Sequence, residues 1–180
     1  ESVIARYRDR YALEPLVRPL VEIATRRGDA LVPLTRLEAH DAYTAAHISN
    51  VALLSTVLAE AMGFPPAAIH DVGVAALLHD IGKLRIPESV LNSNQRLTPE
   101  ELALVRQHPE IGARLLTATP GVPALAPIVA YEHHLQAGGG GYPTVPHGWA
   151  IHPASAITHV ADVYDALRTN RPYRRALEHD

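Results

Sequence analysis

Cysteine is absent from this chain of 180 residues. The protein therefore has no disulfide framework, no thiolate nucleophile and no cysteine-based zinc site. Any bound metal ion must be held by histidine nitrogens and carboxylate oxygens. These donors suit hard metals or iron, manganese and zinc in nitrogen and oxygen coordination.

Surplus positive charge and long apolar runs are also missing. The formal net charge of -3 argues against a broad nucleic-acid or anionic-membrane surface, although it allows a local basic pocket for a small phosphate compound. No apolar run reaches the roughly 18 residues that a membrane helix needs, and the N-terminus lacks a signal-peptide pattern. We expect a cytoplasmic domain that contacts neither DNA, RNA nor membrane.

Hydrophobic spacing predicts a succession of helices. They cover residues 2–27, 38–62, 66–81, a stretch from 98 past 108, a stretch ending at 132, and 151–167. Thr98 and Glu101 form a capping-box pattern at one helix start, and Pro109 should bend or restart that helix. Residues 86–96 have the composition of a loop, and Gly138 to Gly141 form an irregular, glycine-rich one.

The segment around His79 and Asp80 holds the first candidate site. If residues 72–81 are helical, these neighbouring side chains point to different sides of one pocket and can hold one metal or touch two. Gly82 is expected to end the helix, and Lys83 would place a cation near an anionic substrate. The alternative is a buried pair that only bonds a helix end.

Further candidates lie at other helix ends and on helix faces. His108 precedes the break at Pro109, and His133 and His134 follow an apolar helix. His47 lies beside an apolar stripe, where a core histidine is the alternative. The remaining candidates are Asp162 and Asp165, which could instead cap or form salt bridges, and the cluster of Arg168, Arg171, Arg174 and Arg175, which is either a solvated helix end or an anion clamp.

Together these segments supply five imidazoles and two carboxylates, from His47, His79, Asp80, His108, His133, His134 and Asp162. That inventory suits two metal ions sharing the Asp80 carboxylate, with open positions for water and substrate. The remaining histidines are assigned to the surface, caps or packing: His40, His70, His147, His152, His159 and His179.

The chain resembles a known family in five ordered motifs. They are His79-Asp-Ile-Gly-Lys83, His108-Pro-Glu-Ile-Gly112, His133-His134 with Gly139-Gly-Gly-Tyr-Pro143, Ala161-Asp-Val-Tyr-Asp-Ala-Leu167 and Arg171-Pro-Tyr-Arg174. These look like the motifs of the HD-GYP domain, a branch of the HD-superfamily metal phosphohydrolases. The resemblance covers about residues 38 to 175. It implies an all-α fold, a helical bundle with a metal centre in its core, for a domain of residues 38–180 preceded by a helical linker of residues 1–37.

The resemblance also implies an activity and a cofactor. Members hydrolyse the bacterial second messenger cyclic di-GMP to pGpG or GMP, by attack of a water that bridges two metal ions, iron or alternatively manganese. One ion would be held by His47, His79, Asp80 and Asp162, and the other by Asp80, His108, His133 and His134. Tyr43 stands where members with a third metal carry a glutamate, so two ions are expected.

For the substrate, the resemblance implies catalytic roles for Asp80 and Lys83, with Lys83 meeting the scissile phosphate. It places Arg171 and Arg174 on phosphate oxygens and assigns Tyr142 and Asp165 to substrate binding.

Two positions depart from the family pattern, which has Glu and Asp where this chain has Leu135 and Gly138. Neither is a metal ligand by that pattern, but lost support near a ligand can weaken a site. Two alternatives to cyclic di-GMP hydrolysis therefore stay open. One is hydrolysis of another cyclic dinucleotide, such as cyclic GMP-AMP. The other is a non-catalytic module that binds the nucleotide or a GGDEF-type diguanylate cyclase, in a larger regulator that could dimerise through its N-terminal helix.

Overall fold

A computed structural model describes residues 42–93 and 95–168, and the helix bounds are as follows. The elements are α4 (Ala42–Ala61), α5 (Pro66–Leu78), the 3-10 helix η1 (Ile81–Arg85), α6 (Glu88–Leu91), α7 (Pro99–Val105), α8 (His108–Thr117), α9 (Leu125–Glu132) and α10 (Pro153–Arg168). These residues form no strand, only one isolated bridge between Leu135 and Gly141. The predicted all-α class is confirmed. The predicted linker of residues 1–37 and the predicted phosphate contacts Arg171 and Arg174 lie outside the described residues.

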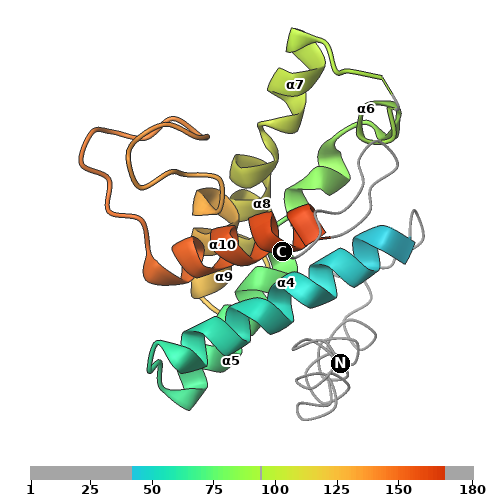
Figure 1. Ribbon diagram of the computed structural model, residues 1–180. Coiled ribbons are helices and arrows are strands. Elements are labelled where there is room, and N and C mark those ends of the chain that lie inside the picture. The colour runs from blue at the N-terminus through green and yellow to red at the C-terminus, as the bar shows by residue number, and fades with distance from the viewer. Residues whose placement is uncertain (1–41, 94, 169–180) are drawn as a thin grey trace.

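The helices form a bundle in which α5 lies beside α4 (Figure 1). Helix α5 packs against α4 and α9, α10 packs across α4, and α8 packs against α9 and η1. Segments far apart in sequence thus meet at one end of α5, where His79 and Asp80 follow its last residue. In the described part of the chain, no helix is both long and apolar enough to span a bilayer.

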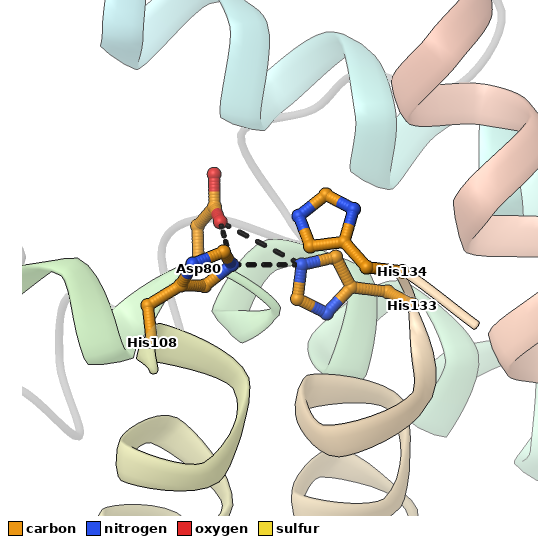
Figure 2. A group of neighbouring side chains, drawn as sticks. All are labelled: Asp80, His108, His133 and His134. Atoms are coloured by element: carbon orange, nitrogen blue, oxygen red, sulfur yellow. Dashed lines mark hydrogen bonds and ion pairs between the residues drawn. The ribbon is translucent and has the colours of Figure 1, made fainter. Parts of the chain in front are cut away.

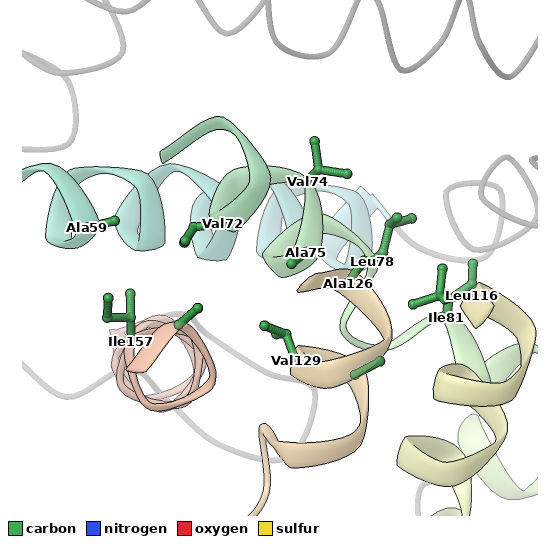
Figure 3. Close-up of a cluster of buried hydrophobic side chains, with 12 residues drawn as sticks. Ala59, Val72, Val74, Ala75, Leu78, Ile81, Leu116, Ala126, Val129 and Ile157 are labelled. Carbon is green, nitrogen blue, oxygen red and sulfur yellow. The ribbon is translucent and has the colours of Figure 1, made fainter. Parts of the chain in front are cut away.

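A cluster of small and branched apolar side chains holds this bundle together (Figure 3). Val72 and Ala75 of α5, with Ala126 and Val129 of α9, are fully buried. Each large side chain buried in this way stabilises the fold by about 1.5–3 kcal/mol. The many alanines allow the helix backbones to approach closely, which brings the helix ends together around Asp80.

Two predicted helix boundaries are confirmed. The capping box is present at the start of α7, where the Glu101 backbone N–H donates to Thr98 Oγ1 and the Thr98 N–H donates to Glu101 Oε2. The helix then restarts before Pro109: α7 ends at Val105 and α8 begins at His108. A proline in the first turn of α8 has no intrahelical hydrogen bond to lose.

Two other predicted boundaries were wrong. Gly82 does not end a helix, because α5 stops at Leu78 and Gly82 lies inside η1. Its role is close packing: a Cβ at Gly82 would collide with the carbonyl oxygen of His108 and approach the backbone nitrogen of Gly112. The predicted loop of residues 86–96 also contains the short helix α6.

Substituting Gly82 should therefore disturb the contact between η1 and α8. Gly82→Ala is expected to lower the free energy of unfolding by about 1–3 kcal/mol, because backbone atoms must move to admit the methyl group. Urea unfolding measures this. Gly138→Ala is the matched control, since a Cβ there would meet no heavy atom within 4 Å and should change stability by less than about 0.5 kcal/mol. Equal effects of the two substitutions would contradict the packing role.

Candidate metal centre

Asp80 lies between α5 and η1 and is buried, with 7% of its surface exposed. Oxygen Oδ1 is 3.1 Å from His108 Nε2 and 3.7 Å from His133 Nε2, and Oδ2 is 3.3 Å from His79 Nε2 and 2.5 Å from Lys83 Nζ. Burial raises the pKa of this carboxyl, but the charges of Lys83 and His79 and the nearby imidazoles of His108 and His133 outweigh burial and hold it well below its usual range. Asp80 is therefore an anion at neutral pH.

The three fully buried histidines are each oriented by a carbonyl oxygen near the end of a helix. His79 Nδ1–H donates to Ala76 O at 2.6 Å, His108 Nδ1–H to Val105 O at 2.7 Å, and His133 Nδ1–H to Ala130 O at 2.9 Å. When such a ring is neutral, the proton on Nδ1 leaves a lone pair on Nε2. All three Nε2 atoms consequently face Asp80 as potential ligands.

The convergence of these atoms fits a bound cation. His108 Nε2 and His133 Nε2 are only 3.2 Å apart, and two lone pairs at that distance repel each other unless a proton or metal lies beside them. Among the described residues, His79 Nε2 and Asp80 Oδ1 are buried without an aligned hydrogen-bond partner. Buried polar atoms are rarely left in this state, so the donor set matches a metal that would satisfy them.

Two groups of side chains could hold such an ion, and they share Asp80. One comprises Asp80, His108, His133 and His134 (Figure 2); the other comprises His47, His79 and Asp80. In each group the candidate ligand atoms all lie within 4.8 Å of one another. All five predicted histidines are thus brought together, on α4, α8 and the residues that follow α5 and α9.

The pKa values of His133 and His134 favour metal binding. Burial lowers the pKa of His133 to about 4, helped by the charges of His79 and His108 and opposed by Asp80. Burial and the charges of His133 and His108 lower the pKa of His134 to about 2. Both rings are neutral at pH 7 and need lose no proton to bind a metal ion.

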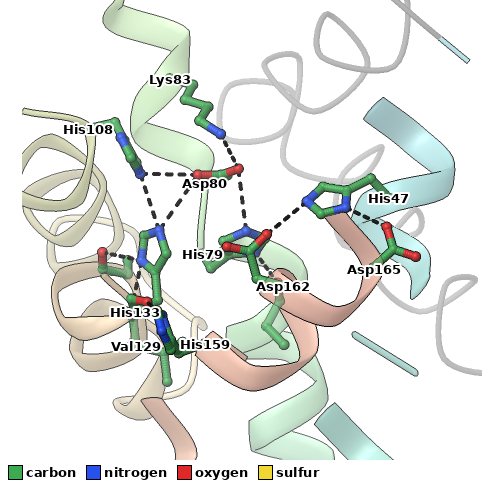
Figure 4. Close-up of polar contacts among 12 residues, drawn as sticks. His47, His79, Asp80, Lys83, His108, Val129, His133, His159, Asp162 and Asp165 are labelled. Atoms are coloured by element: carbon green, nitrogen blue, oxygen red, sulfur yellow. Dashed lines mark hydrogen bonds and ion pairs between the residues drawn. The ribbon is translucent and has the colours of Figure 1, made fainter. Parts of the chain in front are cut away.

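His47 is held differently, by two carboxylates of α10 (Figure 4). Its Nδ1–H donates to Asp165 Oδ2 at 2.6 Å, and its Nε2 lies 3.2 Å from Asp162 Oδ1. Burial lowers the pKa of His47, but the hydrogen bonds and charges of Asp162 and Asp165 outweigh it and raise the pKa to about 9. Asp162, predicted as a metal ligand, thus adjoins the second group through His47.

Asp165, predicted to contact substrate, is engaged in other contacts in the structure. Asp165 is 3% exposed, and its two oxygens accept hydrogen bonds from His47 and from Asn50 Nδ2, the latter at 2.8 Å. A buried carboxylate engaged in this way holds His47 toward the metal centre and is not accessible to a ligand. This carboxylate–histidine pair is typical of the residues that support metal ligands.

Tyr142 borders the first group from the glycine-rich loop. Its ring centroid is 4.5 Å from that of His134 and 6.1 Å from that of His108. Gly141 precedes it with φ +76°, and a Cβ there would collide with the carbonyl oxygen of His134, which is why glycine is required. Leu135 pairs with Gly141 in the isolated bridge and is buried, so the loop closes next to the histidine pair.

Glu132 is a supporting residue that sequence reasoning did not single out. Its carboxylate is 5% exposed and accepts hydrogen bonds from Trp149 Nε1, the His152 backbone N–H and Ser155 Oγ, at 2.9, 2.9 and 2.7 Å. It ties the end of α9, just before His133, to the start of α10. The signal in the sequence that could have identified Glu132 was its position directly before the two candidate ligands His133 and His134. His159, assigned to packing, also fits here: its Nδ1–H donates to His133 O at 2.7 Å.

The fold and the site define a helical domain built around a histidine and carboxylate cluster able to bind metal. The chain belongs to the HD-domain family, whose sequence model matches residues 20–180. The resemblance inferred from the motifs is thereby confirmed. The match begins within the segment predicted as a linker, so the boundary at residue 38 stays a prediction.

Curated relatives carry the same domain within longer chains. A cyclic di-GMP phosphodiesterase of Pseudomonas aeruginosa is 39% identical over 89% of this chain and 39% of its own length. The cyclic di-GMP phosphodiesterase response regulator of Xanthomonas campestris is 34% identical over 92% of this chain and 44% of its own length. A 3'3'-cGAMP-specific phosphodiesterase of Vibrio cholerae is 34% identical over 77% of this chain and 27% of its own length. The chain therefore spans less than half of each of these relatives.

Metal binding should depend on pH differently at the two groups. At pH 7 the protonated His47, with its pKa of about 9, must lose a proton before it binds metal, and the pKa of His79 in the same group is raised as well. Affinity at this group should therefore rise toward pH 9 by about tenfold per pH unit for each proton lost. His133 and His134 are already neutral. Anaerobic Mn(II) titrations that measure free Mn(II) by electron paramagnetic resonance test this. The Mn(II) affinity of one class of site should increase from pH 7 to 9, and the affinity of the other class should stay unchanged. Parallel behaviour of both classes would contradict this division.

Removing the charge of Asp165 should weaken the His47 group. Asp165→Asn is expected to lower metal affinity there by about 10–100-fold, because the partner that orients the ligand loses its charge, while the other group keeps its ion. Metal counting per chain and the urea midpoint separate this effect from unfolding. An unchanged metal content with an increased KM would instead support the substrate contact expected from the sequence.

Proposed function

We propose that this chain is a metal-dependent phosphodiesterase that hydrolyses cyclic di-GMP to pGpG, GMP or both. The observation that carries the proposal is the buried Asp80 carboxylate, shared by two groups of potential ligands. A pair of ions joined by one carboxylate suits the in-line displacement at a phosphodiester. Relatives with cyclic di-GMP phosphodiesterase in their names support the choice of substrate.

The proposed cofactor is a pair of iron ions, with manganese as the alternative. Asp80, His108, His133 and His134 would hold one ion, and His47, His79, Asp80 and Asp162 the other. Nitrogen and oxygen donors without sulfur suit either metal. When bound, the metal ions supply Lewis acidity, which acidifies water and stabilises negative charge on phosphoryl oxygens.

The protein's own residues would position the substrate and balance its charge. Lys83 Nζ lies 2.5 Å from Asp80 Oδ2 with 31% of the side chain exposed, so it can turn from the carboxylate to a phosphate at the edge of the site. We propose that it contacts the scissile phosphate. Burial and the charges of Asp80 and Asp162 raise the pKa of Tyr142, so its hydroxyl stays protonated and able to donate a hydrogen bond to substrate.

Two alternatives differ in substrate or in chemistry. The named 3'3'-cGAMP-specific relative favours another cyclic dinucleotide, because the phosphates and metals would be treated identically. Leu135 and Gly138 instead favour a module that binds the nucleotide or a diguanylate cyclase without hydrolysis. Comparing initial rates for cyclic di-GMP and cyclic GMP-AMP tests the first. Binding of nucleotide by metal-loaded protein without product would establish the second.

The same resemblance suggests the setting, which stays a prediction. A cytoplasmic regulator with a sensor or dimerising helix before residue 38 would place this domain at its output end, with diguanylate cyclases as partners. Size-exclusion chromatography with light scattering of the full-length protein and of residues 38–180 would test the proposed dimer.

Removing Asp80 should abolish both metal binding and activity. Protein loaded anaerobically with Fe(II) or Mn(II) is expected to convert cyclic di-GMP, and Asp80→Ala should lose bound metal and lower kcat by at least about a thousandfold, because neither ion keeps its shared ligand. Metal analysis and product chromatography measure the two effects. Unchanged turnover in the variant would exclude the assignment.

The chain contains a matched control in a second His-Asp dipeptide on the same helix. His70 and Asp71 of α5 form an ion pair at 3.2 Å, with 60% and 46% of their side chains exposed. Asp71→Asn should leave metal content and turnover unchanged. A loss equal to that of Asp80→Ala would point to a general effect of charge on α5.

A further inference from the structure

The metal centre does not distinguish one cyclic dinucleotide from another, because these nucleotides share their phosphates and differ in their bases. A residue that selects the base must lie beyond the metal ligands, about one ribose away from the phosphate. Tyr142 is a candidate for this region, since its ring lies beside His134 and near His108, at the border of the metal-ligand group. An exposed residue that contacts Tyr142 is therefore a candidate for contact with a base.

Arg106 borders Tyr142. It is the residue after α7, two positions before His108, and its guanidinium carbon lies 5.6 Å from the centroid of the Tyr142 ring. The backbone N–H of Arg106 donates to Leu102 O at 3.0 Å, which fixes the start of this side chain at the turn between α7 and α8. The side chain is exposed, so its hydrogen-bond donors can reach a ligand at the edge of the site.

The loop next to Tyr142 leaves room for a planar group. A Cβ at Gly138 or Gly139 would meet no heavy atom within 4 Å, and one at Gly140 would meet only the end of the Gln136 side chain, at 3.4 Å. This part of the loop is exposed. An aromatic ring and a guanidinium group at the exposed edge of a site, next to a loop with open space, can pack against a base and bind it.

We propose that Arg106 and Tyr142 form a guanine subsite, with the base packed beside Tyr142 and its O6 and N7 atoms bound by Arg106. The planar guanidinium matches this pair of acceptors with two parallel hydrogen bonds, whereas adenine presents an amino group in place of O6. Arg106 is thus a specificity determinant for guanine over adenine. The proposal rests on the proposed function, since it assigns one base of the same substrate.

Three nucleotides test the chemistry of the contact. Cyclic di-GMP and cyclic di-IMP both present O6 and N7, whereas cyclic di-AMP does not. Arg106→Ala should lower the affinity for cyclic di-GMP and cyclic di-IMP by about tenfold or more, the effect of losing a bidentate base contact. The affinity for cyclic di-AMP should change by less than about twofold. Arg106→Lys keeps the charge without the paired donors, so it should recover little of this discrimination.

Arg114 is the matched control. It is an exposed arginine of α8 whose Nη2 lies 3.8 Å from Glu110, and Arg114→Ala should leave all three nucleotides unchanged. If Arg106→Ala lowered the affinity for all three nucleotides equally, the contact would be with phosphate, and the base assignment would be overturned. No change for any of them would overturn it as well.

The measurement also separates this inference from the proposed function. If metal-loaded protein hydrolyses the nucleotides, KM values provide the comparison, and kcat should stay within about threefold because the contact is equal in the ground and transition states. If it does not hydrolyse them, the proposed function fails, and dissociation constants of the same protein still test Arg106. Failure of wild-type protein to bind any of the three overturns both.

Discussion

The buried carboxylate of Asp80 is the interaction on which the rest of this structure depends. A charge in a protein interior is costly unless opposite charges and hydrogen-bond donors surround it. Here three imidazoles and the Lys83 ammonium lie within 3.7 Å of its oxygens. Each imidazole is in turn held by a carbonyl near the end of a helix, from Ala76 of α5, Val105 of α7 and Ala130 of α9. These three helix ends therefore meet at this point.

Supporting contacts then hold those helix ends in place. Asp165 connects α10 to His47 of α4, and Glu132 connects the end of α9 to the start of α10. Gly82 allows η1 to lie directly against the start of α8. The small side chains of the core serve the same end, because they let the helices approach closely enough for ligands from four segments to meet.

Chemistry and specificity are separated in this arrangement. In the proposed function, the groups around Asp80 would treat any phosphodiester alike, in line with relatives named for two different cyclic dinucleotides. Tyr142 and Arg106 lie beside these groups, where we propose that a base is bound. Substrate choice can thus change through the rim of the site while the metal ligands stay the same, as expected when function resides in a site built on a common fold.

Much of the fold and of the candidate site follows from the sequence alone. Helical periodicity and the Thr98–Glu101 pattern are local, and they correctly predicted most helices and the restart at His108. The five histidines and Asp80, which the structure brings together, were candidates from the sequence because each stands at a helix end or beside an apolar face and because their motifs occur in order. Local patterns carry this information because they depend on neighbours within a few residues.

Only the tertiary structure decided which distant residues meet. Gly82 was taken for a helix stop. In the local sequence, a glycine that ends a helix cannot be distinguished from a glycine that lies against the backbone of another helix. Asp165 was assigned to substrate, but its partner His47 lies 118 residues away. Glu132 is likewise bound by Ser155, and Arg106 lies near the ring of Tyr142. Both partners are distant in the sequence. The sequence alone thus determined the kind of donors and the helices that carry them. Packing determined which carboxylate lies among the candidate ligands, which one pairs with His47, and which arginine lies beside Tyr142, because these contacts join segments far apart in the chain.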